Sequence, residues 1–148
     1  MKTAAPGLAL IKKFESFKAK PYLCPAGIPT IGYGCTYYPS GKHVTMTDAP
    51  LSEPEASALL RTLLGTYEAG VNRYVQQPIN QNQFDALVSF AYNVGLENLR
   101  SSTLLKKVNL NPNDTALKAE FLKWVHSNGK ILPGLIVRRT EEADLYFK

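Results

Sequence analysis

The spacing of apolar residues divides the front of the chain into a helical stretch and an irregular one. Residues 3–14 predict a short first helix, because Leu8, Ile11 and Phe14 recur at helical spacing, with Thr3 as its cap and Pro6 in the first turn. Residues 20–38 place several prolines and glycines among Tyr, Ile, Thr and Cys, a composition typical of turns and short strands. We therefore expect a small antiparallel sheet after the first helix.

A long helix is predicted over residues 52–77. Ser52-Glu53-Pro54-Glu55 has the form of a capping box, in which the Glu three residues after the Ser reaches back to the cap. An apolar stripe then continues from Ala56 to Val75, and Pro78 is expected to end the helix.

The remainder of the chain predicts shorter helices with short loops, over apolar clusters at residues 84–91, 104–108, 117–125 and 135–146. Asn80 and Asp114 are the expected caps, and Gly95 and Gly129 the expected helix ends. The predicted fold class is α+β in a single domain. A mixed lobe (1–51) with a small antiparallel sheet is joined by a long helix (52–77) to a larger all-helical lobe (78–148). Two such lobes would leave a groove between them in which an extended polymer can lie.

Composition places the chain among ordinary globular domains, since its 148 residues are 45% hydrophobic and 20% charged. No apolar run approaches the ~20 residues of a spanning helix, and the first residues lack the apolar core of a signal peptide. We expect a soluble protein made in a reducing cytoplasm, with no stable membrane insertion.

The net charge of +5 is concentrated at the front, where residues 1–51 hold six Lys against only Glu15 and Asp48. Such a basic segment favours an anionic partner, namely nucleic acid, a cell-wall polymer or a lipid headgroup layer. A charged surface that only keeps the protein soluble explains it equally well. Nucleic acid is the least favoured partner, because no basic and aromatic residues alternate.

Glu15 is the first candidate for chemistry. It lies at the end of the first predicted helix, one turn after Ile11, where the helix face turns from the core toward the sheet. Burial disfavours the charged form of a carboxyl and so keeps it protonated for use as a general acid. The alternative is an ordinary carboxylate at a helix end.

A second carboxylate is missing from the neighbourhood where glycoside cleavage would need one. No Asp or Glu occurs between Ser16 and Thr47, so the facing sheet offers Cys24, Thr30, Cys35, Thr36 and tyrosines. Either a later carboxylate folds in, or a thiol or hydroxyl takes part of that role. Cys24 is otherwise a small buried apolar residue, and it becomes reactive if a cation such as Lys18 or Lys20 lowers the pKa of its thiol.

The two cysteines leave two further questions. A hairpin would bring Cys24 and Cys35 close enough for a disulfide, although a cytoplasmic origin disfavours one. The spacing of Cys24, Cys35, His43 and His126 matches no compact zinc signature, so we predict no metal and no cofactor.

Several motifs in one order resemble the phage-type lysozymes of glycoside hydrolase family twenty-four. The resemblance runs from residue 7 to residue 146. Its motifs are Phe14-Glu15, Tyr22-Leu23-Cys24, Thr30-Ile31-Gly32-Tyr33-Gly34, residues 81–95, Ser102-Thr103-Leu104-Leu105, Phe121-Leu122-Lys123-Trp124-Val125 and residues 133–139.

This resemblance implies a lysozyme-like fold and hydrolysis of the β-1,4 bond between N-acetylmuramic acid and N-acetylglucosamine in peptidoglycan. The family uses a Glu, an Asp and a Thr at fixed spacing. Glu15 falls on the acid and Thr30 on the Thr, whereas Cys24 occupies the Asp position, as in some members of the family. The His that usually follows the Gly-Tyr-Gly run is replaced by Cys35. The resemblance also implies that Tyr92 and Asn93 contact the sugar, with core packing as the alternative for Tyr92.

The resulting hypothesis is a monomeric endolysin that cleaves peptidoglycan late in phage infection. It would remain in the host cytoplasm until a separate holin-type pore lets it reach the periplasmic cell wall. Two alternatives stay open at this point. A lytic transglycosylase would use the same Glu, and a wall-binding protein would have kept the fold while losing the chemistry.

Overall fold

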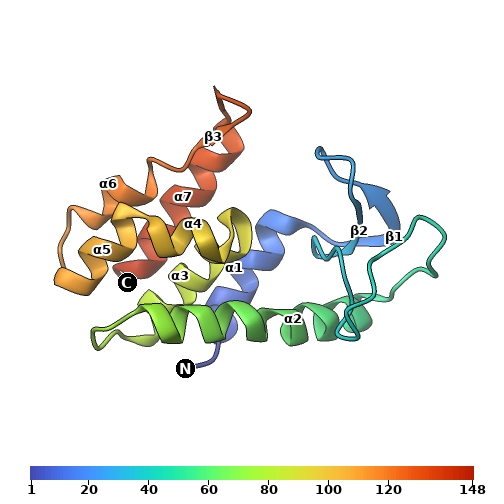
Figure 1. Cartoon of the computed structure of the whole chain (residues 1–148), viewed down its shortest axis with the longest axis horizontal. Coiled ribbons are helices and arrows are strands. Elements are labelled where there is room, and N and C mark those ends of the chain that lie inside the picture. The colour runs from blue at the N-terminus through green and yellow to red at the C-terminus, as the bar shows by residue number, and fades with distance from the viewer. The chain divides into compact units, whose positions relative to one another are not determined.

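The computed structural model describes residues 1–148, which divide into two compact units (Figure 1). The smaller unit comprises residues 12–66, and the larger unit comprises residues 1–11 and 67–148. Helix α1 (Ala5–Glu15) and helix α2 (Glu53–Tyr74) each contribute residues to both units. The class is α+β, with helices and a small two-stranded antiparallel sheet, as predicted. No helix combines the length and the apolar character needed to cross a membrane.

The smaller unit is built on the hairpin of β1 (Lys18–Leu23) and β2 (Pro29–Gly32), which lie side by side in Figure 1. Tyr22 lies opposite Thr30 across the pair. Gly32 has φ +66°, and a Cβ there would lie 3.3 Å from the Cβ of Ala56 on α2. A glycine at this position therefore lets the end of the sheet approach the helix closely.

Helix α2 begins as the sequence predicts. The Ser52 N–H donates to Oε1 of Glu55 at 3.1 Å, and the Glu55 N–H donates to Oγ of Ser52 at 3.2 Å, so the capping box is confirmed. The predicted end at residue 77 is wrong, because the helix stops at Tyr74. There the amide of Asn109 accepts from the Gln76 N–H at 2.7 Å and donates to the Tyr74 carbonyl at 3.0 Å, so a side chain from another helix closes the turn.

The start of α1 is also fixed from elsewhere in the chain. Thr3 is not its cap, since the helix begins at Ala5 and the Thr3 N–H donates to Oε1 of Glu68 at 2.8 Å. The buried carboxylate of Asp85 instead accepts from the N–H groups of Ala4 and Gly7 at 3.1 and 3.2 Å. An acceptor from a different helix thus satisfies the orphan donors that Thr3 was expected to satisfy.

The larger unit is centred on α3 (Gln81–Val94), which packs against α7 (Pro133–Tyr146). Asn80 caps α3 in a capping box with Gln83, and Gly95 ends the helix with φ +94°, as predicted. The remaining helices of the unit are α4 (Leu96–Ser101), α5 (Thr103–Leu110) and α6 (Leu117–Phe121).

Two expectations for the larger unit are wrong. It is not all helical, because β3 (His126–Ser127) and β4 (Lys130–Ile131) form a short hairpin. Asn128 and Gly129 join these strands with φ of +51° and +75°, so Gly129 serves a hairpin turn and not a helix end. Asp114 accepts from the Ala116 N–H at 2.9 Å, but it is not the cap of α6, which begins at Leu117.

Candidate active site

Glu15 is the last residue of α1 and is half-buried. The next residue, Ser16, has φ +57°, and its N–H donates to the Lys12 carbonyl at 3.0 Å. This left-handed residue ends the helix and redirects the chain into β1. The carboxyl group of Glu15 is thereby held at the corner between a helix end and the first strand.

Cys24 follows β1 in a tight turn. The Gly27 N–H donates to the Cys24 carbonyl at 2.8 Å, and the Cys24 N–H donates to the Ile28 carbonyl at 3.1 Å. Gly27 has φ +76°, a conformation that strains any residue with a Cβ. The turn brings the backbone N–H groups of Ala26 and Ile28 close to the half-buried thiol of Cys24.

The surroundings of Cys24 lower the pKa of its thiol. The main cause is hydrogen bonding from the Ile28 N–H, which burial of the sulfur partly opposes. The Ala26 N–H and the Thr30 hydroxyl lower the pKa further. The expected help from Lys18 or Lys20 is therefore wrong, because backbone donors and a hydroxyl supply the effect.

Thr30 lies on β2 with only 2% of its surface exposed. Its hydroxyl donates to the Ile28 carbonyl at 2.8 Å. A hydroxyl has one hydrogen and two lone pairs. With its hydrogen donated to the Ile28 carbonyl, Oγ1 of Thr30 can still accept hydrogen bonds from other groups. When the hydroxyl rotates toward the Cys24 sulfur instead, it becomes a donor that stabilises the thiolate.

Tyr22 links these groups. The pKa of its phenol is raised chiefly by burial, and the negative charges of Glu15, Cys24 and Cys35 raise it further. The phenol therefore lies within electrostatic reach of both the predicted acid and the predicted thiol. Sequence reasoning missed Tyr22 as a site residue, although its position two residues before Cys24 put both on one face of an extended segment.

Within the smaller unit, Tyr22 lies opposite Thr30 across the hairpin, and the charges of Glu15 and Cys24 both raise the pKa of its phenol. No disulfide joins Cys24 and Cys35. No group of three or more His, Cys, Asp and Glu side chains is arranged to hold a metal ion.

Tyr92 and Asn93 lie in the larger unit, near the end of α3. The half-buried ring of Tyr92 meets the ring of Tyr67 edge-on, with centroids 5.1 Å apart. The exposed Asn93 accepts a hydrogen bond at Oδ1 from the guanidinium of Arg139, which is fully buried. Tyr92 therefore packs within the unit, whereas Asn93 is held in place by a buried cation.

Arg139 belongs to a buried ionic network between α3 and α7. Its Nη1 donates to Oε2 of Glu142 at 2.5 Å and its Nε donates to the Trp124 carbonyl at 2.9 Å. Arg138 and Ser89 donate to Oε1 of Glu142 at 3.1 and 2.8 Å. Because every charge in this network has a partner, its members stay ordered within the core.

A cavity of about 350 Å³ opens beside this network. Its lining combines amide, imidazole and hydroxyl groups with the Trp124 ring and two leucines. The residues that line it are Asn93, Val94, Asn98, Trp124, His126, Ser127, Leu132, Leu135 and Arg139. An aromatic face among amide groups is suited to a sugar or a short peptide.

Comparison with known proteins gives one family for nearly the whole chain. Residues 12–142 match the sequence model of the phage lysozyme family. The endolysin of Bacillus phage B103 is 42% identical over 99% of the chain, which spans 54% of that relative's length.

Two solved structures share the fold. The endolysin from Escherichia coli O157:H7 phage FAHEc1 is 36% identical with a TM-score of 0.91, and the match covers 100% of this chain and 94% of that one. The muramidase domain of SpmX from Asticaccaulis excentricus is 35% identical with a TM-score of 0.85, and the match covers 99% and 98% of the two chains.

Proposed function

Because the chain belongs to the phage lysozyme family, we propose that it is an endolysin that hydrolyses the β-1,4 bond between N-acetylmuramic acid and N-acetylglucosamine in peptidoglycan. The observation that carries this proposal is that Glu15 ends α1 directly before a hairpin whose turn holds Cys24 and whose second strand holds Thr30, with the charges of Glu15 and Cys24 both acting on Tyr22. The muramidase named among the similar structures supports the choice of bond.

Glu15 acts as the general acid in this proposal. Its half-buried position at the corner after α1 lets it donate a proton to the glycosidic oxygen as the bond to the anomeric carbon breaks. The smaller unit supplies no second carboxylate on the hairpin beside it, so the remaining work falls to the thiol and the hydroxyl.

Cys24 and Thr30 position and partly activate the attacking water. A water that donates one hydrogen to Thr30 Oγ1 and the other to the Cys24 sulfur keeps a lone pair free for the anomeric carbon. The lowered pKa of the Cys24 thiol increases the fraction present as thiolate, which accepts such a hydrogen better than a thiol does. As the new C–O bond forms, the water's proton passes toward the sulfur, while Glu15 has already given its proton to the leaving oxygen.

Substrate contacts beyond the bond are proposed for the end of α3. Asn93 lines the 350 Å³ cavity and its orientation is fixed by Arg139, so its amide can hold a sugar or peptide group. Tyr92 would contribute through its ring. The basic segment at the front of the chain would attract the anionic peptide stems of the wall.

The proposed route follows from the same chemistry. The substrate lies outside the host cytoplasm, so the enzyme would work as a monomer on the periplasmic wall after a separate pore has opened the inner membrane.

The test is to analyse, by chromatography and mass spectrometry, the muropeptides that the wild type and three variants release from purified peptidoglycan. Glu15→Gln should lose activity by about 10²–10⁴-fold, the range of a general acid. Cys24→Ala should be much slower than the wild type, and Cys24→Asp should remain active. Glu55→Gln is the matched control, because Gln also completes a capping box and the variant should cleave normally.

Each alternative has its own signature in this experiment. Products with 1,6-anhydro ends would show a lytic transglycosylase, because only an internal hydroxyl attack forms them. Sedimentation with the wall without any released muropeptide would show a binding protein. Appreciable turnover by Glu15→Gln would remove Glu15 from the role of acid.

A further inference from the structure

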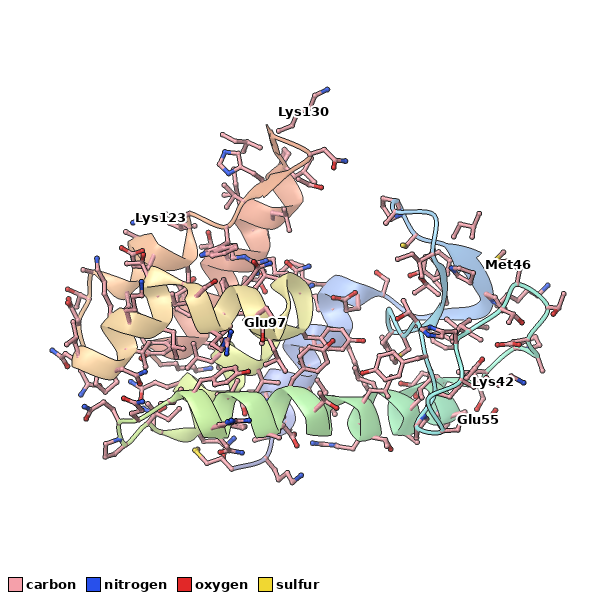
Figure 2. The ribbon with its side chains drawn as sticks, viewed as in Figure 1. Lys42, Met46, Glu55, Glu97, Lys123 and Lys130 are labelled. Carbon is pink, nitrogen blue, oxygen red and sulfur yellow. The ribbon has the colours of Figure 1, made fainter.

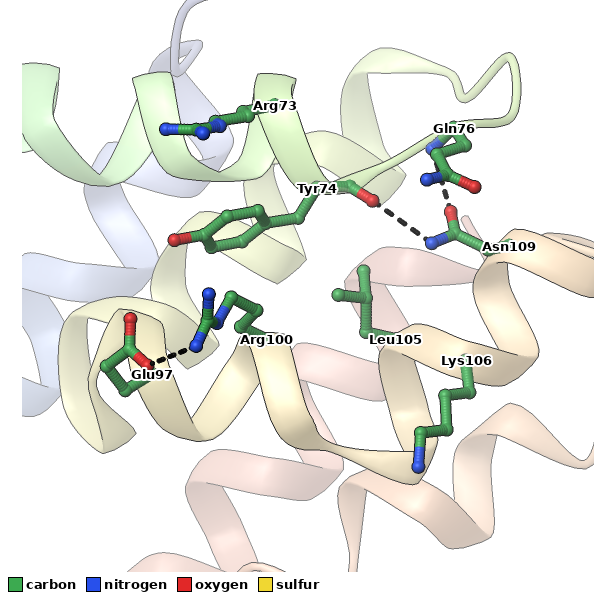
Figure 3. A pocket seen from close by; sticks show the side chains of 8 residues that line it. All are labelled: Arg73, Tyr74, Gln76, Glu97, Arg100, Leu105, Lys106 and Asn109. Atoms are coloured by element: carbon green, nitrogen blue, oxygen red, sulfur yellow. Dashed lines mark hydrogen bonds and ion pairs between the residues drawn. The ribbon is translucent and has the colours of Figure 1, made fainter.

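A larger cavity lies in the larger unit, where the end of α2 meets α4 and α5 (Figure 3). Its volume is about 550 Å³. Polar and charged side chains dominate the lining, whose residues are Arg73, Tyr74, Gln76, Glu97, Arg100, Leu105, Lys106 and Asn109. None of these residues belongs to the candidate active site or to the cavity beside Asn93.

The charge of this cavity is unbalanced. Arg73, Arg100 and Lys106 face a single acid, Glu97. Glu97 pairs with Arg100 at 3.1 Å, and both side chains are mostly exposed, so this pair contributes little and opens easily. The side chains of Arg73 and Lys106 make no ion pair or hydrogen bond within the protein; the N–H of Lys106 donates only to the carbonyl of Ser102, the N-cap of its own helix. The cavity therefore carries two uncompensated positive charges and a third that is only weakly held.

The arrangement of the side chains suits an anion. In Figure 3 the guanidinium groups of Arg73 and Arg100 lie on the two sides of the Tyr74 ring, while Lys106 stands apart from them with its amine pointing away from the ring. The Glu97 carboxylate lies 3.1 Å from Nη2 of Arg100, so an anion in the cavity would compete with it for this guanidinium. The wall behind them is rigid, because Asn109 is bonded to both Gln76 and the Tyr74 carbonyl.

We infer that this cavity binds a phosphate group carried by an anionic cell-wall polymer. A tetrahedral phosphate accepts hydrogen bonds from several directions, which matches cations on three different helices, whereas one guanidinium fork already satisfies a planar carboxylate. A lipid surface fits less well, because Leu105, the only aliphatic side chain in the lining, is buried and cannot insert into a bilayer.

The consequence is a second wall contact that is separate from catalysis. It rests on the proposed function for bringing the enzyme to a wall, and it acts only where that wall, periplasmic or Gram-positive, carries a phosphate-bearing polymer; the affinity for phosphate belongs to the cavity itself. Binding there would retain the enzyme on phosphate-bearing walls and would weaken as the salt concentration rises.

The first test is titration of the whole protein with inorganic phosphate, followed by backbone amide NMR shifts. Shifts should be centred on the ends of α2, α4 and α5. Arg73→Gln should weaken binding about tenfold, the loss of roughly one charge-assisted hydrogen bond, whereas Glu97→Gln should tighten binding. Lys130→Gln is the control of equal charge change, because Lys130 projects outward from the β3–β4 hairpin (Figure 2). An equal loss for Lys130→Gln, or no localised shift, would overturn the site.

The second test separates the sources of the phosphate. Sedimentation is measured with the Glu15→Gln protein, so that the wall stays intact, on Gram-positive walls before and after hydrofluoric acid removes phosphodiester-linked polymers. The Arg73→Gln change should reduce sedimentation on untreated walls only. Stronger dependence on Arg73 for anionic phosphatidylglycerol vesicles would assign the site to lipid and overturn the proposal. Muropeptide release from treated walls tests the proposed hydrolysis independently of either result.

Discussion

The sharpest consequence for the fold concerns Gly7, near the start of α1. In an isolated helix, replacing Gly by Ala stabilises by about 1 kcal/mol, because Ala loses less backbone entropy. Here an added Cβ would lie 2.6 Å from the Cβ of Asp85, 2.7 Å from its Cγ and 2.9 Å from the Cγ2 of Thr3. These distances are far below van der Waals contact, and Asp85 is fully buried within α3. Asp85, Thr3 or the start of α1 must therefore shift to make room for the added Cβ.

The magnitude follows from what moves. Overpacking of a core costs about 1–3 kcal/mol. Displacing Asp85 also weakens its bonds to the Ala4 and Gly7 N–H groups, at 3.1 and 3.2 Å, and a lost hydrogen bond to a charged group costs about 1.5–3 kcal/mol. Set against the propensity gain of about 1 kcal/mol, Gly7→Ala should lower the free energy of unfolding by about 1.5–5 kcal/mol.

Urea unfolding followed by circular dichroism measures this difference, with Gly65→Ala as the control. Gly65 lies inside α2, and an added Cβ there would meet nothing within 4 Å. That variant should therefore gain up to about 1 kcal/mol. A Gly7→Ala protein as stable as the wild type would refute the clamp by Asp85, since propensity alone would then describe both positions.

Two further predictions concern titration. The rate at which iodoacetamide alkylates Cys24 can be followed by mass spectrometry as a function of pH, and its midpoint should lie below the ordinary thiol pKa of 9.0. Lys18→Gln should leave this midpoint unchanged, because N–H donors cause the shift. A midpoint at 9.0 or above would contradict the lowered pKa. Bonds from Thr45 and then Tyr38 lower the pKa of Asp48 to about 2, so its stabilising contribution is complete above the ordinary value of 3.8 and is lost as the pH falls through about 2. Tyr38→Phe should raise the pKa of Asp48 in a carbon NMR titration, and an unchanged midpoint would exclude the phenol as a cause.

The sequence pattern predicted correctly the helix ends whose backbone groups are satisfied by residues nearby in the sequence. The capping boxes at Ser52 and Asn80 are complete within four residues, so the pattern alone placed both helix starts correctly. The start of α1 and the end of α2 were misplaced because Asp85 and Asn109, distant in sequence, satisfy the backbone there. No pattern around a helix end reveals a partner from another helix.

The hairpin at residues 126–131 was missed for a different reason. Asn128-Gly129 is a strong signal for a two-residue hairpin turn, but helical apolar spacing before it favoured reading Gly129 as a helix end. The buried pair Arg138 and Arg139 had no clear signal. Adjacent arginines usually lie at the surface, and only their spacing to Glu142, three and four residues on, indicates the network they form.

For the candidate site, sequence reasoning named Glu15, Cys24 and Thr30 as candidates but did not identify the groups that lower the pKa of the Cys24 thiol. An aspartate is ionised at neutral pH without help, whereas a thiol at the same position needs donors. Those donors are the N–H groups of Ile28 and Ala26, which the turn after Cys24 brings to the sulfur. A Cβ on Gly27 would meet nothing within 4 Å, so space does not require a glycine there; its φ of +76° does. The backbone conformation that this glycine permits is therefore what lowers the pKa of the Cys24 thiol, and the proposed role of a cysteine in the place of a carboxylate depends on it.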